Sequence, residues 1–344
     1  DVGLESESGI DTFDAGDSQA GVDVVDVAFA AKANVTGGTG DDTLAPGPGN
    51  TMIDGGKGDD TAVFAGQREA FDLAVNEAGK LAVSGGPNDI TATLTAVETL
   101  ELDDTAAFGV EVVQNGESLQ EAVKTADAGK TIVVAPGAYT PDVPDGDATI
   151  PRLTIPKTLK LVGPQAGVEG DADTRGPEAT IQGQVAVEGP DTVIDGFEVN
   201  GSSLHPSNNQ DGEALRIQRP ADGAVVQNTV VRNFDGSALS EDMGGIVAFG
   251  GDDGGTADAD VLENVEIRDN SVTNLNGPAL DFGAAGISLQ GNVDTATVSG
   301  NKIAGVGEGT TFAFGIVVRD SGKIRLDAKD TPRNLTIKDN QVAS

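Results

Sequence analysis

The chain has 344 residues, enough for two or three domains, and a formal net charge of −35 that repels nucleic acids and anionic membranes but attracts divalent cations. The absence of cysteine excludes disulfides and thiol chemistry, and no apolar run is long enough to span a membrane. With 48 glycines and 3% aromatic residues, the composition favours an all-β fold with many turns, packed from Val, Ile, Leu and Ala.

Residues 1–36 are acidic and rich in Gly and Ser, and they become apolar near their end. The alternation of Val22, Val24 and Val27 predicts one strand there. The chain begins at Asp1 without Met and stops at Ser344 within a strand pattern. We therefore expect it to be a piece of a longer or processed protein.

Residues 37–63 read GGTGDDTLA, PGPGNTMID and GGKGDDTAV, three units of nine residues in one register. The first follows the pattern G-G-x-G-x-D-x-U-x, with U a large apolar residue, which is typical of a calcium-binding parallel β-roll, and the third departs from it only by Ala62 in the U position. Two units make one turn, so the first and third loops should stack on one side and present Asp oxygens to a hard cation. The predicted metal-site residues are Gly37, Gly38, Gly40, Asp42, Gly55, Gly56, Gly58 and Asp60.

The middle unit carries Thr51 where the other two carry Asp. We therefore expect one calcium site between the first and third loops and, opposite it, at best a degenerate site. A flexible linker rich in Gly and Asp is the alternative interpretation, but it does not explain the apolar slots Leu44 and Ile53 in strict register.

Residues 64–113 are predicted to form a β-hairpin module, with strands at 71–75 and 81–83 joined by a turn. Two phrases flank this hairpin, V-F-x-G-x-R-x-x-F before it and V-E-x-L-x-L after it; their residues are Val63, Phe64, Gly66, Arg68, Phe71, Val97, Glu98, Leu100 and Leu102. Over residues 37–105 the chain thus resembles repeats-in-toxin (haemolysin-type) proteins. The resemblance implies a capping β module without activity of its own, calcium as cofactor, and type I secretion.

Residues 114–344 begin with a short helix. Ser118 and Glu121 form a capping-box pattern, an apolar face follows, and Gly129 precedes a strand at 131–134. Residues 119–139 also fit a longer sequence pattern that runs through the helix and the strands after it. The residues that fit it are Leu119, Gln120, Ala122, Val123, Ala126, Gly129, Thr131, Ile132, Val134, Gly137 and Tyr139. They resemble the first turn of pectin-lyase-like proteins, which implies a right-handed parallel β-helix whose open end the helix caps.

Two phrases then recur along the chain. The first has a turn slot spaced by 33, 32, 42, 31 and 39 residues, at Gly163, Gly196, Asn228, Asn270, Asn301 and Asn340. The second is spaced by 31, 41 and 29 residues, at Leu215, Ile246, Ile287 and Ile316. Such repeats predict a solenoid, with an insertion at 250–260. We expect the asparagines to adopt the left-handed turn and to stack their amides in a ladder.

An enzyme must be weighed, because β-helix proteins include polysaccharide lyases, hydrolases and epimerases. The candidate catalytic residues lie in or beside the polar loop at 202–216, and they are His205, Asp211, Glu213 and Arg216. Such a site needs a base and a cation for a uronate, or two carboxylates for hydrolysis. The Tyr-Gly-Phe/Ile-Asp-Pro-His motif of mannuronan epimerases is absent, and with no Trp and one Tyr the sugar-stacking platform is missing. Acidic residues paired with Arg216, Arg232 and Arg268 would then form surface ladders.

We therefore expect an all-β chain with four parts, which are an N-terminal β segment (1–36), a calcium β-roll (37–63), a β-hairpin module (64–113) and a helix-capped parallel β-helix (114–344) that is incomplete at its C-terminal end. The expected function is that of a secreted, calcium-stabilised structural protein of the cell surface, such as a surface-layer, adhesin or filament subunit. Its partners would be further copies or other surface proteins. The alternative is a lyase or epimerase acting on uronic-acid polysaccharides.

Overall fold

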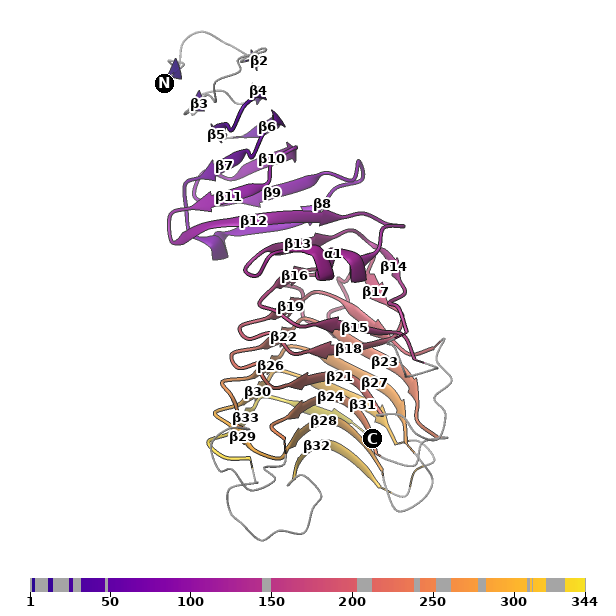
Figure 1. The fold of residues 1–344 in the computed structure, drawn as a ribbon. Helices are drawn as coiled ribbons and strands as arrows, with labels where there is room; N and C mark the ends of the chain where they lie inside the picture. The colour runs from indigo at the N-terminus through magenta and orange to yellow at the C-terminus, as the bar shows by residue number, and fades with distance from the viewer. Residues whose placement is uncertain are drawn as a thin grey trace. The chain divides into compact units, whose positions relative to one another are not determined.

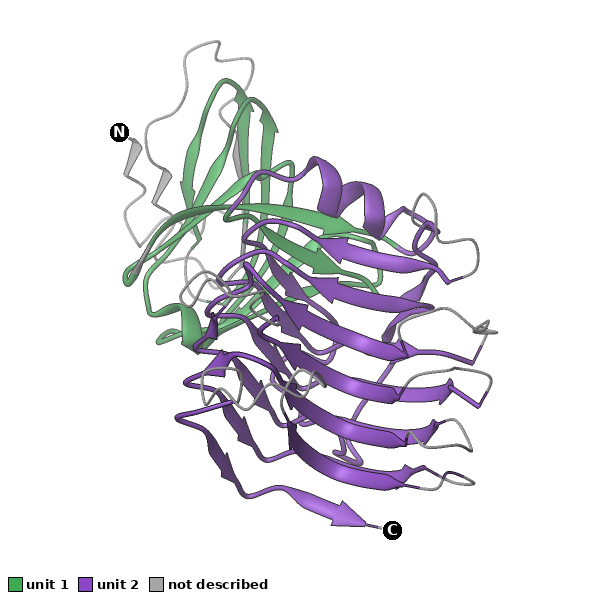
Figure 2. Ribbon diagram, turned by 60° about the horizontal axis from the view of Figure 1, so that its bottom comes forward, with its two compact units in different colours: residues 1–114, 129–135 green, residues 115–128, 136–344 purple. Residues whose placement is uncertain are grey.

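The computed structural model of the chain describes residues 2–3, 12–14, 25–26, 32–46, 49–143, 150–202, 212–237, 242–251, 261–277, 283–307, 310, 312–319 and 332–343. The chain divides into two compact units, which Figure 2 colours separately. The first unit comprises residues 1–114 and 129–135, and the second comprises residues 115–128 and 136–344.

The first unit is built from two sheets of mainly parallel strands. One sheet has the order β1 (Val2–Gly3), β3 (Val25–Asp26), β5 (Thr43–Ala45), β7 (Thr61–Phe64), β11 (Thr99–Leu102), β12 (Thr105–Val113) and β13 (Thr131–Val134). The other has the order β2 (Thr12–Asp14), β4 (Lys32–Thr39), β6 (Asn50–Lys57), β10 (Ile90–Thr95), β9 (Leu81–Gly85) and β8 (Phe71–Val75).

The nine-residue units coil as their register predicts. Strand β4 pairs in parallel with β6, and β5 pairs with β7, so that each residue lies beside the one a full turn later. The apolar slot of each unit points inward, since Leu44, Ile53 and Ala62 are all buried. Alternation of inward and outward side chains along short strands thus produces the core of this unit.

The predicted hairpin is confirmed, and it interrupts the coils without ending them. Strands β8 and β9 pair antiparallel after a short 3-10 helix at Arg68–Ala70. The chain then returns to the coils, because β10 pairs in parallel with β6 and β11 with β7. Residues predicted as a separate module therefore extend both sheets to which the nine-residue units belong.

The second unit is a right-handed parallel β-helix with three long faces (Figure 1). The first face contains β16 (Lys160–Val162), β19 (Val193–Asp195), β22 (Val225–Gln227), β26 (Glu266–Arg268), β30 (Thr297–Ser299) and β33 (Thr336–Lys338). The second contains β14 (Gly137–Tyr139), β17 (Ala179–Ile181), β20 (Glu198–Asn200), β23 (Val230–Asp235), β27 (Ser271–Asn276), β31 (Lys302–Val306) and β34 (Gln341–Ala343). The third contains β15 (Arg152–Ile155), β18 (Gln184–Val187), β21 (Glu213–Gln218), β24 (Met243–Phe249), β28 (Ala284–Gln290) and β32 (Ala313–Arg319).

Inward rows of aliphatic side chains form the core of the β-helix. The recurring phrase at Leu215, Ile246, Ile287 and Ile316 is confirmed as one such row, because these residues pair from coil to coil. The insertion at 250–260 falls largely outside the described residues, although the short pair β25 (Leu262–Glu263) and β29 (Val293–Asp294) follows it.

The predicted helix α1 spans Leu119–Thr125. The hydroxyl of Ser118 accepts a hydrogen bond from the Glu121 N–H at 3.1 Å, as the capping-box pattern predicts. Leu119, Ala122 and Val123 are buried, and the helix lies at one end of the β-helix (Figure 2), where it contacts β15. No helix in the described part of the chain is long and apolar enough to cross a membrane.

The asparagine ladder forms, but its turn geometry differs from the expectation. Asn270 and Asn301 each donate a backbone N–H to the side-chain oxygen of the next rung, Asn301 and Asn340, at 3.0 Å. The rung before Asn270 is the backbone of Thr229, so Asn228 lies one residue out of register. In the last three coils the left-handed conformation is adopted by the residue before each asparagine of the ladder, namely Asp269, Gly300 and Asp339.

We predict that Asn301→Ala lowers the free energy of unfolding by about 3 kcal/mol, because it leaves the buried N–H of Asn270 without its acceptor and removes the amide contacts. Chemical denaturation of both proteins measures this loss. Gln341→Ala, which removes an amide from an exposed position of β34, should change the unfolding free energy by less than about 0.5 kcal/mol. Equal losses for the two variants would show that the ladder does not stabilise the β-helix.

Candidate functional site

The two loops predicted to hold a metal stack directly on each other. They lie in neighbouring coils, where Gly38 pairs in register with Gly56. The N–H of Thr61 also donates to the Asp42 carbonyl at 2.8 Å. The stacking is too close for side chains, because a Cβ added to Gly56 would lie 2.1 Å from the Gly38 carbonyl oxygen. Gly56 also has a φ of +100°, which other residues rarely adopt.

Both predicted aspartates are buried at this stack, Asp42 with 2% and Asp60 with 0% of its surface exposed. They are linked directly, since the Asp42 N–H donates to Asp60 Oδ1 at 2.8 Å. Asp60 Oδ2 is buried and has no hydrogen-bond partner among the described residues. A buried carboxylate oxygen without a donor costs free energy unless the group is protonated or a cation neutralises it.

The electrostatic surroundings of Asp60 act in the same direction. Burial raises the pKa of its carboxyl above the ordinary value of 3.8, opposed by the hydrogen bond from Asp42, and the nearby carboxylates of Asp42, Glu98 and Asp41 raise it further. No ion pair with Lys or Arg compensates Asp60 in the part of the chain that the structure describes.

The donor set suits calcium better than a metal held by side chains alone. A Cβ added to Gly37 would lie 2.3 Å from Asp42 Oδ2 and 2.5 Å from the Gly55 carbonyl oxygen, so a carboxylate and a carbonyl converge there. Among the described residues no group of three His, Cys, Asp or Glu side chains is arranged to hold a metal. Calcium takes six to eight oxygens and readily uses carbonyls and water for several of them.

On the opposite side of the coil, the middle unit has a threonine in place of the aspartate. Thr51 lies there, buried, and its hydroxyl has no hydrogen-bond partner among the described residues. A neutral hydroxyl supplies no charge, so Thr51 does not reproduce the environment of Asp42 and Asp60.

The candidate catalytic residues are only partly placed. His205 and Asp211 lie outside the described residues. Glu213 and Arg216 lie on β21, where Arg216 Nη1 contacts Glu213 Oε2 at 2.9 Å and the guanidinium lies over the Phe249 ring, 4.6 Å from its centre. These two candidate side chains are therefore engaged with the protein itself.

These two residues line a small groove of about 110 Å³ on the third face of the β-helix. Its other polar side chains also pair along the face. Arg152 donates to Gln184, and Gln218 donates to Glu188 at 2.7 Å. Elsewhere on the β-helix, Arg232 contacts Glu198 at 2.7 Å and Arg268 contacts Glu266 at 3.3 Å. Arg152 and Arg232 thus pair across neighbouring strands, whereas Arg216 and Arg268 each pair with a glutamate of their own strand.

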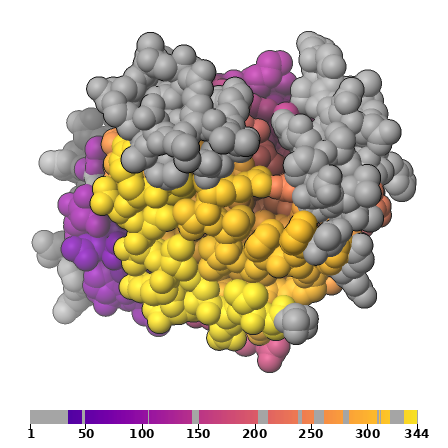
Figure 3. All heavy atoms as spheres, turned by 90° about the horizontal axis from the view of Figure 1, so that it is seen from below, coloured from indigo at the N-terminus to yellow at the C-terminus, as the bar shows by residue number. Residues whose placement is uncertain are grey.

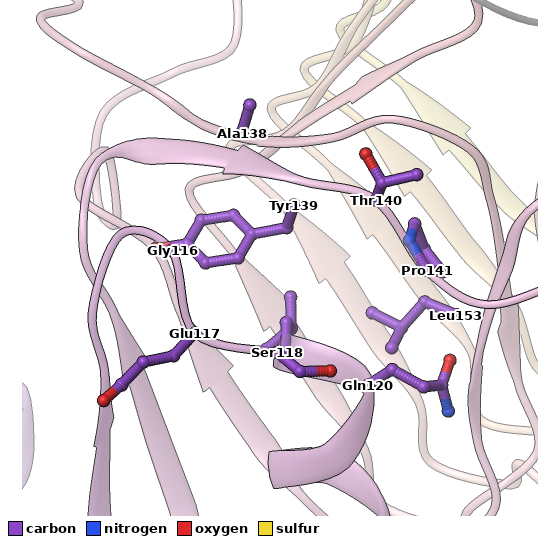
Figure 4. Close-up of a pocket in the computed structure, with 10 residues that line it drawn as sticks. Gly116, Glu117, Ser118, Gln120, Ala138, Tyr139, Thr140, Pro141 and Leu153 are labelled. Carbon is purple, nitrogen blue, oxygen red and sulfur yellow. The ribbon is translucent and has the colours of Figure 1, made fainter.

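A second pocket, of about 270 Å³, lies beside α1 and was not identified from the sequence (Figure 4). Its lining includes Tyr139, Gln120 and Leu153. Burial, with a smaller effect from the charge of Glu117, raises the pKa of Tyr139 to about 12. The phenol therefore keeps its proton at neutral pH and is not suited to act as a base there.

Comparisons with known proteins add one distant likeness. No protein family and no curated protein matches the chain. Among solved structures, a mutant of the PL6 family alginate lyase AlyGC is similar at 14% sequence identity with a TM-score of 0.29. The alignment covers 89% of this chain and 58% of the lyase chain. A likeness of this strength supports no inference about activity.

The raised pKa of Asp60 predicts a pH dependence for the metal-free protein. Its stabilising contribution is complete below pH about 3.8 and is lost as the pH rises through the raised folded-state pKa, because only the folded state disfavours the ionised carboxyl. With a chelator present, the free energy of unfolding should therefore fall over this window in the wild type, and this fall should be missing in Asp60→Asn.

Denaturation curves at a series of pH values measure the difference between the two proteins. Asp72→Asn, at an exposed position of β8 in the same unit, should follow the wild type. Parallel curves for the wild type and Asp60→Asn would contradict the prediction.

Proposed function

We propose that this protein is an extracellular structural protein whose first unit is stabilised by calcium bound between the loops at 37–42 and 55–60. The observation that carries the proposal is the buried carboxylate pair Asp42 and Asp60, beside which Asp42 Oδ2 and the Gly55 carbonyl oxygen converge at Gly37. Calcium would be held by the carboxylates of Asp42 and Asp60 together with loop carbonyls such as that of Gly55.

An extracellular location accords with this chemistry. Calcium sites of extracellular modules have dissociation constants of roughly 10⁻⁴ to 10⁻³ M, which match calcium concentrations outside cells. The chain has no cysteine, so a bound ion would take the stabilising role that disulfides have in many secreted proteins. Export by type I secretion belongs to the same proposal and depends on the repeats-in-toxin resemblance of residues 37–105.

Assembly is the second part of the proposal, with a further copy of the chain as the partner. In the last described coil, inward rows that are buried in earlier coils become exposed; Val318, Ile337 and Val342 have exposed fractions of 43%, 44% and 59%. Figure 3 views the β-helix from this end. Strands β32, β33 and β34 are the last of their sheets among the described residues, so they offer apolar surface and strand edges to a further copy or to a continuation of the β-helix. Because each copy carries a charge of −35, association should need salt or divalent cations.

A polysaccharide lyase or epimerase is the second candidate, favoured by the groove that Arg152, Glu213 and Arg216 line. An arginine could neutralise a uronate carboxylate, but here both are already bound to polar neighbours. Incubation with alginate and pectate, followed by ultraviolet absorbance of unsaturated product and by NMR of the uronic-acid composition, separates the two candidates. Turnover of either glycan would contradict a purely structural role.

Calcium should stabilise the wild type by about 3 kcal/mol at a concentration one hundred times the dissociation constant, and the double variant Asp42→Asn/Asp60→Asn should lose this gain. Thermal unfolding with and without calcium measures it as a rise in Tm of several degrees. Asp54→Asn, an exposed aspartate of β6, should keep the full rise. An undiminished rise in the double variant would show that the ion binds elsewhere.

For assembly, Ile337→Lys and Val342→Lys should each weaken self-association at least tenfold, because a charge then replaces apolar contact area. Sedimentation velocity and electron microscopy with and without millimolar calcium measure the assembly. Gln341→Lys, at an exposed polar position between them, should retain it. A wild type that stays monomeric under all these conditions would contradict this part of the proposal.

A further inference from the structure

A third loop joins the stack of the two predicted calcium loops. Strand β10 pairs with β6 so that Thr95 lies beside Asp54, and β11 pairs with β7 so that Thr99 lies beside Thr61. The residues between these strands, 96–98, therefore occupy the same place as the loop at 55–60, one turn later. In this register Ala96 corresponds to Gly55, and Glu98 corresponds to Asp60.

The contacts of this third loop repeat those of the first two. The Asp60 N–H donates to Glu98 Oε2 at 2.9 Å, as the Asp42 N–H donates to Asp60 Oδ1 at 2.8 Å one turn earlier. A carboxylate thus accepts the same backbone hydrogen bond in two successive turns, although the third loop lacks the glycines and the Asp of the repeat.

The oxygens around Gly55 also repeat those around Gly37. A Cβ added to Gly55 would lie 2.0 Å from the Ala96 carbonyl oxygen and 2.4 Å from Asp60 Oδ2. These two oxygens therefore lie close together on one side of Gly55, within the span that one calcium ion bridges, about 5 Å between ligands that each lie 2.3–2.6 Å from it. At Gly37 the equivalent oxygens come from Gly55 and Asp42.

Charge and access both suit a cation at this second position. Asp60 is fully buried, and its Oδ2, next to Gly55, has no hydrogen-bond partner among the described residues. Glu98 is half-buried, and neither it nor Asp60 pairs with Lys or Arg in the described part of the chain. Ala96 is exposed, so water can reach the loop and complete the coordination of an ion.

We propose that a second calcium ion binds between the loops at 55–60 and 96–98, with Asp60 Oδ2, the Ala96 carbonyl and the Glu98 carboxylate as protein ligands. The proposal rests on the proposed calcium function and extends the row of ions one turn past the last nine-residue unit. Asp42 then belongs to the first site, Glu98 to the second, and Asp60 lies between them. Calcium would thereby join the strands on both sides of the hairpin.

Calcium binding to the full chain, measured by isothermal titration calorimetry and equilibrium dialysis, tests the second site. We expect Glu98→Gln and Asp42→Asn each to bind one ion fewer than the wild type. The double variant Asp42→Asn/Glu98→Gln should bind two fewer. Gln at position 98 keeps an acceptor for the Asp60 N–H, and circular dichroism checks that the variant is folded. The matched control is Glu101→Gln, at an exposed carboxylate of β11, which should bind as many ions as the wild type.

The other outcomes separate this inference from the proposed function. If Asp42→Asn loses one ion and Glu98→Gln loses none, the second site is wrong and the first stands. If the double variant loses only one ion, a single shared site explains the data and the second site is again wrong. If the wild type binds no calcium, both proposals are wrong.

Discussion

Parallel hydrogen bonding between successive coils is the constraint on which both units depend. It places each residue beside its counterpart one turn away, so every row along the structure repeats one chemical type or must compensate for a change. Rows of Leu, Ile and Val gain apolar burial with each added coil. The asparagine row gains a side-chain hydrogen bond and a backbone hydrogen bond at each rung. The same constraint makes a row of carboxylates costly, because like charges are brought into contact.

The two units meet this cost in different ways. On the β-helix, acidic residues face arginines, as in the pairs of Glu198 with Arg232 and Asp294 with Arg333. In the first unit, Asp42, Asp60 and Glu98 follow one another through three turns and are joined by backbone N–H donors. Those donors satisfy one oxygen of Asp60 and leave its other oxygen buried without a hydrogen bond among the described residues. Calcium at this row is the physical reason we propose for keeping three acidic side chains where arginine is absent.

The flanking phrases around the hairpin also acquire a physical explanation. The rings of Phe64 and Phe71 pack edge to face with their centres 5.7 Å apart, and Arg68 Nη1 donates to the Phe71 carbonyl at 2.6 Å. The N–H of Gly66 donates to Asp103 at the end of β11. The chain thus leaves the coils after β7 and returns to them at β10, and the Gly66–Asp103 hydrogen bond joins the segment after β7 to the end of β11. Gly66 and Asp103, which are far apart in sequence, are therefore in contact where the hairpin interrupts the coils.

The sequence by itself determined the local elements, because their signals are short in range. The hairpin, the Ser118 cap of α1, the strand at 131–134 and the apolar slots all follow from alternation, capping and turn residues. Only the tertiary structure decided which residues share a row. Spacing suggested Asn228 as a rung, whereas strand register makes Thr229 the rung, and no pattern of the repeat marks Ala96 and Glu98 as a third loop. The reason is that the hairpin places Ala96 and Glu98 far in sequence from the loop at 55–60. Backbone pairing between successive coils brings the two loops side by side in the structure.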